Sequence, residues 1–365
     1  MRSFLAALVP LIACAAAAAQ ELAPPAGAAP PAVGPADAAL VDQILAESPK
    51  GRLAIHAVQG SAGGDPVGSV DVQVDLYHNN RPLKQLTATL DENGVVVLED
   101  VPIILGVRPV VKVEYGGVTY LEVGAPMDAE NPEAVVTVTV YETTDETPQW
   151  DVAMRHVIAE PTPEGAVVGE TLVVQNPADR TWLGGPPDAQ DRRTTVRVHL
   201  PEGARDVQLT SGFHGWCCTT LEGNELAVQM PLMPGQTTFQ YSYMVPPHDG
   251  HADLRITAPA PMRTAVFFVP MGGDVEAIGM QEAEAPAMGG AAQMRMFQAQ
   301  DIASGQEMGV VLTGGAVAAA ASGSAAHARL LALIGAGLVV VAIIGVMAVR
   351  AGRQRQRAAG AVDAS

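Results

Sequence analysis

The sequence predicts a mainly β protein built of two tandem antiparallel β-sandwiches, followed by one C-terminal transmembrane helix. Two observations predict the sandwiches: apolar residues recur at every second position in many short runs, and segments rich in Gly, Asn, Asp and Pro separate these runs. A third observation predicts the helix. Residues 330–349 form an uncharged apolar run of about 20 residues, which spans a bilayer at ~1.5 Å rise per residue.

Both ends of the chain carry targeting features. Arg2 precedes an apolar stretch and an alanine run ending at Ala19, so residues 1–19 are predicted to be a secretory signal peptide. The apolar run near the other end is followed by Arg350, Arg353, Arg355 and Arg357. By the positive-inside rule, residues 350–365 are a cytoplasmic tail. The chain is therefore expected to be a single-pass protein of the cytoplasmic membrane, with a periplasmic or extracellular ectodomain.

Cys14 leaves a second possibility open for the N-terminus. The segment Leu11-Ile12-Ala13-Cys14 resembles the lipobox of bacterial lipoproteins, in which the cysteine becomes the lipidated first residue. A lipid would add little anchoring to a chain that already spans the membrane. Cleavage near Ala19 is favoured.

Composition excludes some classes of function. The chain has 365 residues and a formal net charge of −18, and the ectodomain is more acidic still because Arg2 and the four arginines of the tail lie outside it. Binding of nucleic acid requires clustered Lys and Arg, so nucleic-acid partners are not expected. Only Cys217 and Cys218 remain beyond the signal segment, so the domains are stabilised by hydrophobic cores and not by a disulfide framework.

Residues 20–50 are predicted to be an Ala/Pro-rich spacer that ends in a short helix. Asp37 can cap this helix, and Ser48-Pro49 ends it. Its apolar residues are Leu40, Val41, Ile44 and Leu45. We expect this face to dock on the following domain.

Residues 51–145 are predicted to form the first sandwich, with seven antiparallel strands. Alternating apolar positions occur at Leu53 to Ala57, Val70 to Leu76, Val111 to Tyr115 and Val136 to Val140. The order of these runs, the segment Thr87 to Gly94 and the step Asp100-Val101-Pro102 resemble the carboxypeptidase regulatory-like, or transthyretin-like, sandwich, in which a T-x-x-D-x-x-G hairpin sets the strand register. The resemblance covers about residues 51–142. It implies a fold and no catalytic residue.

Residues 150–270 are predicted to form a second, immunoglobulin-like sandwich of eight strands. The polar segment from Glu142 to Gln149 is expected to separate the two domains. Residues 271–328 are predicted to be a linker and stalk, which includes a possible hairpin at 293–300 and 307–313. In the membrane helix, Gly335-Ala336-Gly337 and Gly345 offer a small-residue face through which two copies could associate.

No established catalytic motif stands on a matching element, so the chain is predicted not to be an enzyme and no cofactor is expected. One group of Cys and His residues is a candidate metal or redox site. Counting strands places the loop with His214, Cys217 and Cys218 at the same end of the second sandwich as the loop with His248 and His251. Thiolate and imidazole suit zinc or copper, but adjacent cysteines chelate one tetrahedral ion poorly, and a vicinal disulfide is favoured over a metal site.

The combined expectation is a tethered envelope module that binds or scaffolds another envelope protein or a polysaccharide. The alternative is a redox or metal-handling accessory protein that uses Cys217, Cys218 and the nearby histidines.

Overall fold

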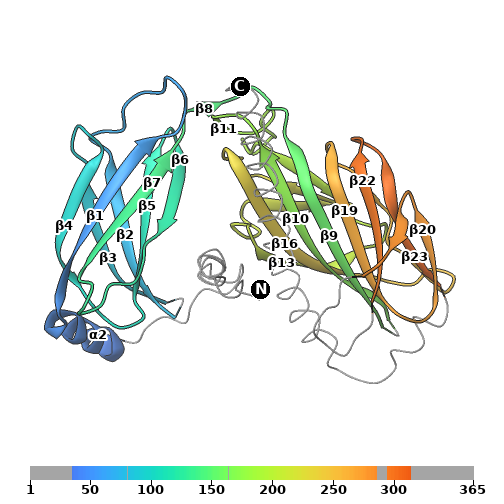
Figure 1. Cartoon of the computed structure of the whole chain (residues 1–365), viewed down its shortest axis with the longest axis horizontal. Helices are drawn as coiled ribbons and strands as arrows, with labels where there is room; N and C mark the ends of the chain where they lie inside the picture. The colour runs from blue at the N-terminus through green and yellow to red at the C-terminus, as the bar shows by residue number, and fades with distance from the viewer. Residues whose placement is uncertain (1–34, 80, 163, 286–293, 314–365) are drawn as a thin grey trace, which may run out of the picture.

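The computed structural model describes residues 35–79, 81–162, 164–285 and 294–313, and this part of the chain is mainly β, as predicted. The strands form two sandwiches, coloured blue to bluish green and green to orange in Figure 1. Among the residues described, no helix is long and apolar enough to cross a membrane. The predicted signal peptide, membrane span at 330–349 and basic tail lie outside the described residues.

The first sandwich packs a four-stranded sheet against a three-stranded sheet. The larger sheet has the order β3 (Arg81–Thr89), β2 (Asp71–His78), β5 (Arg108–Tyr115), β6 (Val118–Val123), and the smaller has the order β4 (Val95–Pro102), β1 (Lys50–Gln59), β7 (Glu133–Val140). The number of strands agrees with the prediction, but the pairing is not wholly antiparallel, because β7 runs parallel to β1. The chain reaches β7 from β6 in the other sheet by a crossover, and a crossover permits parallel pairing where a hairpin would not.

The turn between β3 and β4 depends on Asp91 and Gly94. The Asp91 carboxylate accepts hydrogen bonds from the backbone N–H groups of Asn93 and Val95, at 2.9 and 2.8 Å. Gly94 has φ +76°, and a Cβ there would lie 2.5 Å from the carbonyl oxygen of Val67. Asp91 and Gly94 therefore fix the turn that sets the register of β4.

Helix α2 (Pro35–Glu47) precedes this sandwich and begins earlier than the predicted cap at Asp37. Fewer of its apolar residues are buried against the following domain than we expected. Leu45 is buried, but Leu40 and Ile44 are 56% and 48% exposed. The helix touches the domain near its C-terminal end, where the Lys50 ammonium donates to the carbonyl oxygen of Leu45 at 2.6 Å.

The second sandwich is larger than an immunoglobulin domain. Its main sheet has the order β13 (Arg205–Ser211), β16 (Gly235–Val245), β10 (Gly165–Asn176), β9 (Asp151–Thr162), β19 (Met262–Pro270), β22 (Met294–Ile302), β21 (Gln281–Ala283). Facing it are β12 (Val196–His199), β15 (Glu225–Val228) and β14 (Thr219–Glu222), and the strand β23 (Glu307–Thr313) with its partners β17 (His251–Asp253), β18 (Ile256–Thr257) and β20 (Asp274–Ile278). This differs from the four-plus-three arrangement of immunoglobulin domains, and β19 runs parallel to β9.

The boundary predicted at residue 270 is wrong. Strands β20 to β23 lie in the segment 271–328 that was predicted to be linker, stalk and a possible hairpin, and they complete the second sandwich. The two strands expected at 293–300 and 307–313 are β22 and β23, but they lie in different sheets and do not form a hairpin. Phe297, Met308 and Leu312 are at most 2% exposed in its core. The short strands β20 and β21 combine acidic and small residues, which makes them resemble a linker in composition.

The polar segment between the sandwiches is not a free hinge. It forms β8 (Thr143–Thr144), which pairs in parallel with β11 (Thr181–Trp182) of the second sandwich, as seen between the two bodies in Figure 1. Beside this pair, the buried Tyr120 hydroxyl donates to the carbonyl oxygen of Tyr141 at 2.9 Å and lies 2.8 Å from Thr181 Oγ1. These contacts couple the two domains.

A charged pair lies inside the second sandwich. Arg155 of β9 and Glu170 of β10 have fully buried side chains, with Nε and Oε2 2.7 Å apart. The hydroxyls of Tyr241 and Tyr243 donate to the Glu170 carboxylate, and Arg155 Nη2 donates to the carbonyl oxygen of His199 at 2.9 Å. Burial opposes ionisation of Arg155, but the Glu170 carboxylate outweighs it and raises the arginine pKa.

The opposite face of the main sheet is also apolar. Ile158, Val167 and Phe268 are buried there, with Val266 and two methionines packed against them. His156 shares this face and meets the Phe268 ring edge-on, with centroids 4.9 Å apart. Burial lowers the pKa of His156 to about 4.

The buried ion pair predicts a large asymmetry between core and surface charges. Glu170→Ala leaves the Arg155 guanidinium buried without its counter-charge and is expected to cost about 3–5 kcal/mol in the free energy of unfolding. The matched control is Glu222→Ala, which removes an exposed partner of Arg197 and is expected to cost about 1 kcal/mol or less. Urea denaturation of both variants measures the difference, and equal losses would contradict the argument.

His156 predicts a specific loss of stability in acid. Its pKa is lower in the folded than in the unfolded state, so its contribution is fully present above pH 6.5 and decreases as pH falls towards 4. The full effect is about 3 kcal/mol. His156→Leu should flatten the pH dependence of unfolding between pH 6.5 and 5, whereas His248→Leu, at a 94% exposed side chain, should leave it unchanged.

Candidate binding surface

The predicted Cys/His constellation does not come together. The loop with His214, Cys217 and Cys218 follows β13, and Gly212 at its base lies against the carbonyl oxygen of Thr238, near the start of β16. The loop with His248 and His251 follows the end of β16, where Pro246 lies against Gly203. Because β13 and β16 are antiparallel, the two loops lie at opposite ends of the sheet.

The error has a simple cause. The predicted order ran directly from the strand at 207–210 to the strand at 226–230, but Thr219–Glu222 forms the additional strand β14 between them. One extra strand reverses the direction of every strand that follows. The prediction of a metal site formed by both loops is therefore wrong. Among the described residues, no group of three or more His, Cys, Asp or Glu side chains could hold a metal ion.

His248 and His251 form a tight hairpin turn of their own. The backbone N–H of each donates to the carbonyl oxygen of the other, at 2.8 and 2.9 Å. Asp249 and Gly250 occupy the centre with φ of +50° and +79°, as a two-residue hairpin requires. The imidazoles have separate neighbours: His248 Nδ1 lies 3.4 Å from Asp249, and His251 Nδ1 lies 3.4 Å from the Thr313 hydroxyl.

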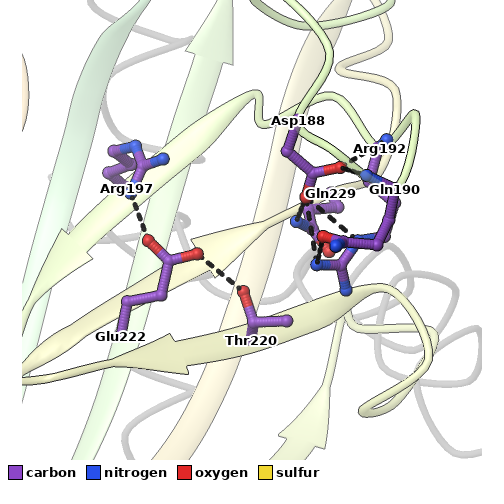
Figure 2. Close-up of polar contacts among 7 residues, drawn as sticks. All are labelled: Asp188, Gln190, Arg192, Arg197, Thr220, Glu222 and Gln229. Atoms are coloured by element: carbon purple, nitrogen blue, oxygen red, sulfur yellow. Dashed lines mark hydrogen bonds and ion pairs between the residues drawn. The ribbon is translucent and has the colours of Figure 1, made fainter.

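A polar surface occupies the outer face of the small sheet β12-β15-β14 and continues onto the loop 185–194. Figure 2 shows Arg197, Glu222 and Thr220 on the strands, and Asp188, Gln190, Arg192 and Gln229 beside them. We call these seven residues, together with Glu225, the polar face. Arg197 Nη1 lies 3.2 Å from the Glu222 carboxylate and 2.8 Å from that of Glu225. Hydrogen bonds to these carboxylates raise the pKa of Arg197.

Asp188 orders the loop at one end of the polar face. Its Oδ1 accepts hydrogen bonds from the backbone N–H groups of Gln190 and Arg192, both at 2.9 Å, and its Oδ2 accepts one from Arg192 Nε at 3.1 Å. These bonds, led by that from the Arg192 N–H, lower the pKa of Asp188. At the far side of the loop, Arg193 reaches Asp145 of the domain junction at 2.5 Å. The loop therefore presents Gln190 and Arg192 in a fixed conformation.

Trp216 lies on the loop that adjoins the polar face. It is 48% exposed, unlike Trp182, which is buried. The loop is joined to the polar face through its C-terminal end, because the backbone N–H of Gln229 donates to the carbonyl oxygen of Cys218 at 2.8 Å. Gln229 Nε2 in turn lies 3.5 Å from Asp188 Oδ2. An exposed indole therefore lies on a loop whose Cys218 end is hydrogen-bonded to Gln229 of the polar face.

Comparison with known proteins leaves the function to be argued from this surface. No family model and no curated protein match the chain. A shaft pilin, SpaA of Lactobacillus rhamnosus GG, is 11% identical and covers 61% of this chain and 99% of its own, with a TM-score of 0.19. A protein of Bacteroides eggerthii described as a candidate for cell adhesion is 10% identical, with coverages of 70% and 98% and a TM-score of 0.18. Similarity at these TM-scores supports no functional argument.

Sequence reasoning singled out the loop that adjoins the polar face and missed the polar face itself. His214, Trp216 and the cysteines attracted attention because they cluster in the sequence. Asp188, Arg192, Arg197 and Glu222 are separated by up to 34 positions and meet only after β12 and β14 are in place. One signal was available: D-x-x-x-R at 188–192 within a Pro/Gly-rich loop is typical of an aspartate that caps a turn.

Proposed function

We propose that the chain is a non-catalytic, membrane-tethered module of the cell envelope that binds another envelope protein through the polar face and Trp216. The observation that carries the proposal is the exposed Trp216 indole on a loop that is hydrogen-bonded, through the carbonyl oxygen of Cys218, to Gln229 of the polar face. Trp and Arg are enriched among the residues that dominate binding energy at protein interfaces. Because the loop 185–194 is already ordered, little conformational entropy is lost on association.

A second candidate function rests on a different observation. The outer face of β3, β2 and β5 in the first sandwich is hollowed to about 520 Å³. Its lining combines the uncharged polar side chains of Gln73, Thr87 and Thr89 with the charged side chains of Asp71, Lys112 and Glu114. Such a trough suits the hydroxyl groups of a polysaccharide strand, so the two sandwiches could bind different classes of partner.

The protein-binding proposal predicts a strong effect of one side chain. Trp216→Ala should weaken binding of an envelope partner by about 30-fold or more, as expected for the loss of about 2 kcal/mol at an interface anchor. The matched control is Met271→Ala, which truncates another large apolar side chain that is 56% exposed. Partners captured from an envelope extract by the wild-type protein are purified and titrated against both variants by calorimetry.

The outcome also separates the two candidates. A purified protein that binds the wild-type chain and the Met271→Ala variant equally, but not Trp216→Ala, supports the proposal. Binding that survives proteolysis of the extract and is abolished by Thr87→Trp in the trough would instead support a polysaccharide ligand. A partner that binds all these variants equally would contradict both.

Membrane tethering predicts a defined orientation. Protease added to intact spheroplasts should digest the bulk of the chain and spare a small C-terminal fragment that contains the basic tail. Replacement of Arg350, Arg353, Arg355 and Arg357 by Glu should make the orientation less uniform, because positive charges set it. Protection of the whole ectodomain in the unmodified protein would contradict the topology.

A further inference from the structure

Cys217 and Cys218 form a pair of thiols on the loop next to the polar face. Their sulfur atoms lie 3.1 Å apart and are not bonded. The two side chains differ in environment: Cys217 is exposed, whereas Cys218 is half-buried. Burial and the contact with Cys217 raise the pKa of Cys218 to about 11. The pair therefore combines an accessible sulfur with a shielded sulfur in contact with it.

We propose that Cys217 and Cys218 are a thiol–disulfide exchange site, in which Cys217 attacks an incoming disulfide and Cys218 closes the pair to a vicinal disulfide that repositions Trp216. The exchange itself is independent of the proposed function. The consequence for partner binding rests on it, because Trp216 is the anchor of the proposed surface.

The co-reactant is a small disulfide of the glutathione class. The Cys217 thiolate attacks one sulfur of the disulfide, a mixed disulfide forms, and one thiolate leaves. Cys218 then loses its proton, attacks the Cys217 sulfur and releases the second thiolate. The protein loses two electrons and two protons, and the small disulfide is reduced to two thiols. An accessible attacking thiol and a resolving thiol in contact with it are the two requirements of this sequence.

Oxidation is coupled to Trp216 through the backbone. The Cys218 N–H donates to the carbonyl oxygen of Gly215 at 3.2 Å, which closes a turn around Trp216 and Cys217. The far side of Cys218 is held by the bond from the Gln229 N–H to its carbonyl oxygen. A covalent bond between adjacent side chains constrains the peptide that joins them. Because one side of that peptide is held by β15 and its neighbours, the turn that carries Trp216 must adjust.

The test uses the full chain in detergent and glutathione disulfide as the probe. We expect the wild-type protein to lose two hydrogen atoms by intact mass, with both cysteines found in one cross-linked peptide. Cys218→Ser should accumulate a mixed disulfide at Cys217, because it lacks the resolving thiol. Cys217→Ser should form a mixed disulfide at Cys218 at least about tenfold more slowly than Cys218→Ser forms one at Cys217. The reason is that the half-buried Cys218 thiol is largely protonated.

The same samples report on Trp216. Oxidation should change the tryptophan emission of the wild-type protein, and Trp216→Phe should abolish that change while Trp150 and Trp182 still contribute to the emission. Three results would overturn the proposal: a wild-type protein that remains reduced or stops at a mixed disulfide, a reversed order of reactivity of the two cysteines, or identical emission before and after oxidation. None of these depends on a partner. Failure of the reduced protein to bind any envelope protein would count against the proposed function alone.

Discussion

The ion pair between Arg155 and Glu170 constrains the second sandwich more than any apolar contact does. A guanidinium and a carboxylate with no exposed surface are tolerated only if nearly all their hydrogen-bonding groups find partners. The two tyrosine hydroxyls of β16 and the carbonyl oxygen of His199 supply these partners. Strands β9, β10 and β16 must therefore keep their register, and β12 must lie directly above Arg155.

This constraint extends to the polar face. His199 belongs to β12, the strand that also carries Arg197, and β12 holds β15 and then β14 by hydrogen bonds. A displacement of β12 would leave the Arg155 guanidinium without one of its partners in the core. The position of Arg197 relative to Glu222 on the outer surface is thus fixed from inside the domain. A buried polar network of this kind favours one arrangement of the sheets over others of similar hydrophobic content.

The strands with one buried face were predictable because their side chains alternate. Leu53, Ile55 and Ala57 face the core as the pattern indicates. Alternation fails where both faces are covered: β10 is buried at almost every position, including Glu170, so its inward residues cannot be told from its outward ones by sequence. Strand β14 was missed because it has one apolar residue, Leu221, in four positions. Because β14 was omitted, the predicted directions of all later strands were reversed, and the His248 loop was placed at the same end of the sheet as the Cys217 loop.

The polar break from Glu142 to Gln149 shows a further limit of sequence reasoning. Its composition is that of a linker, and nothing in it indicates that Thr143 and Thr144 pair with Thr181 and Trp182. Long-range pairing over two residues has no periodicity to detect. This pairing places Asp145 next to Arg193, at the edge of the ordered loop, and the two side chains form an ion pair. The junction between the domains is therefore connected to the polar face. A partner bound at the polar face therefore contacts a surface whose orientation depends on both sandwiches, and variants that loosen the junction should weaken binding without touching the partner.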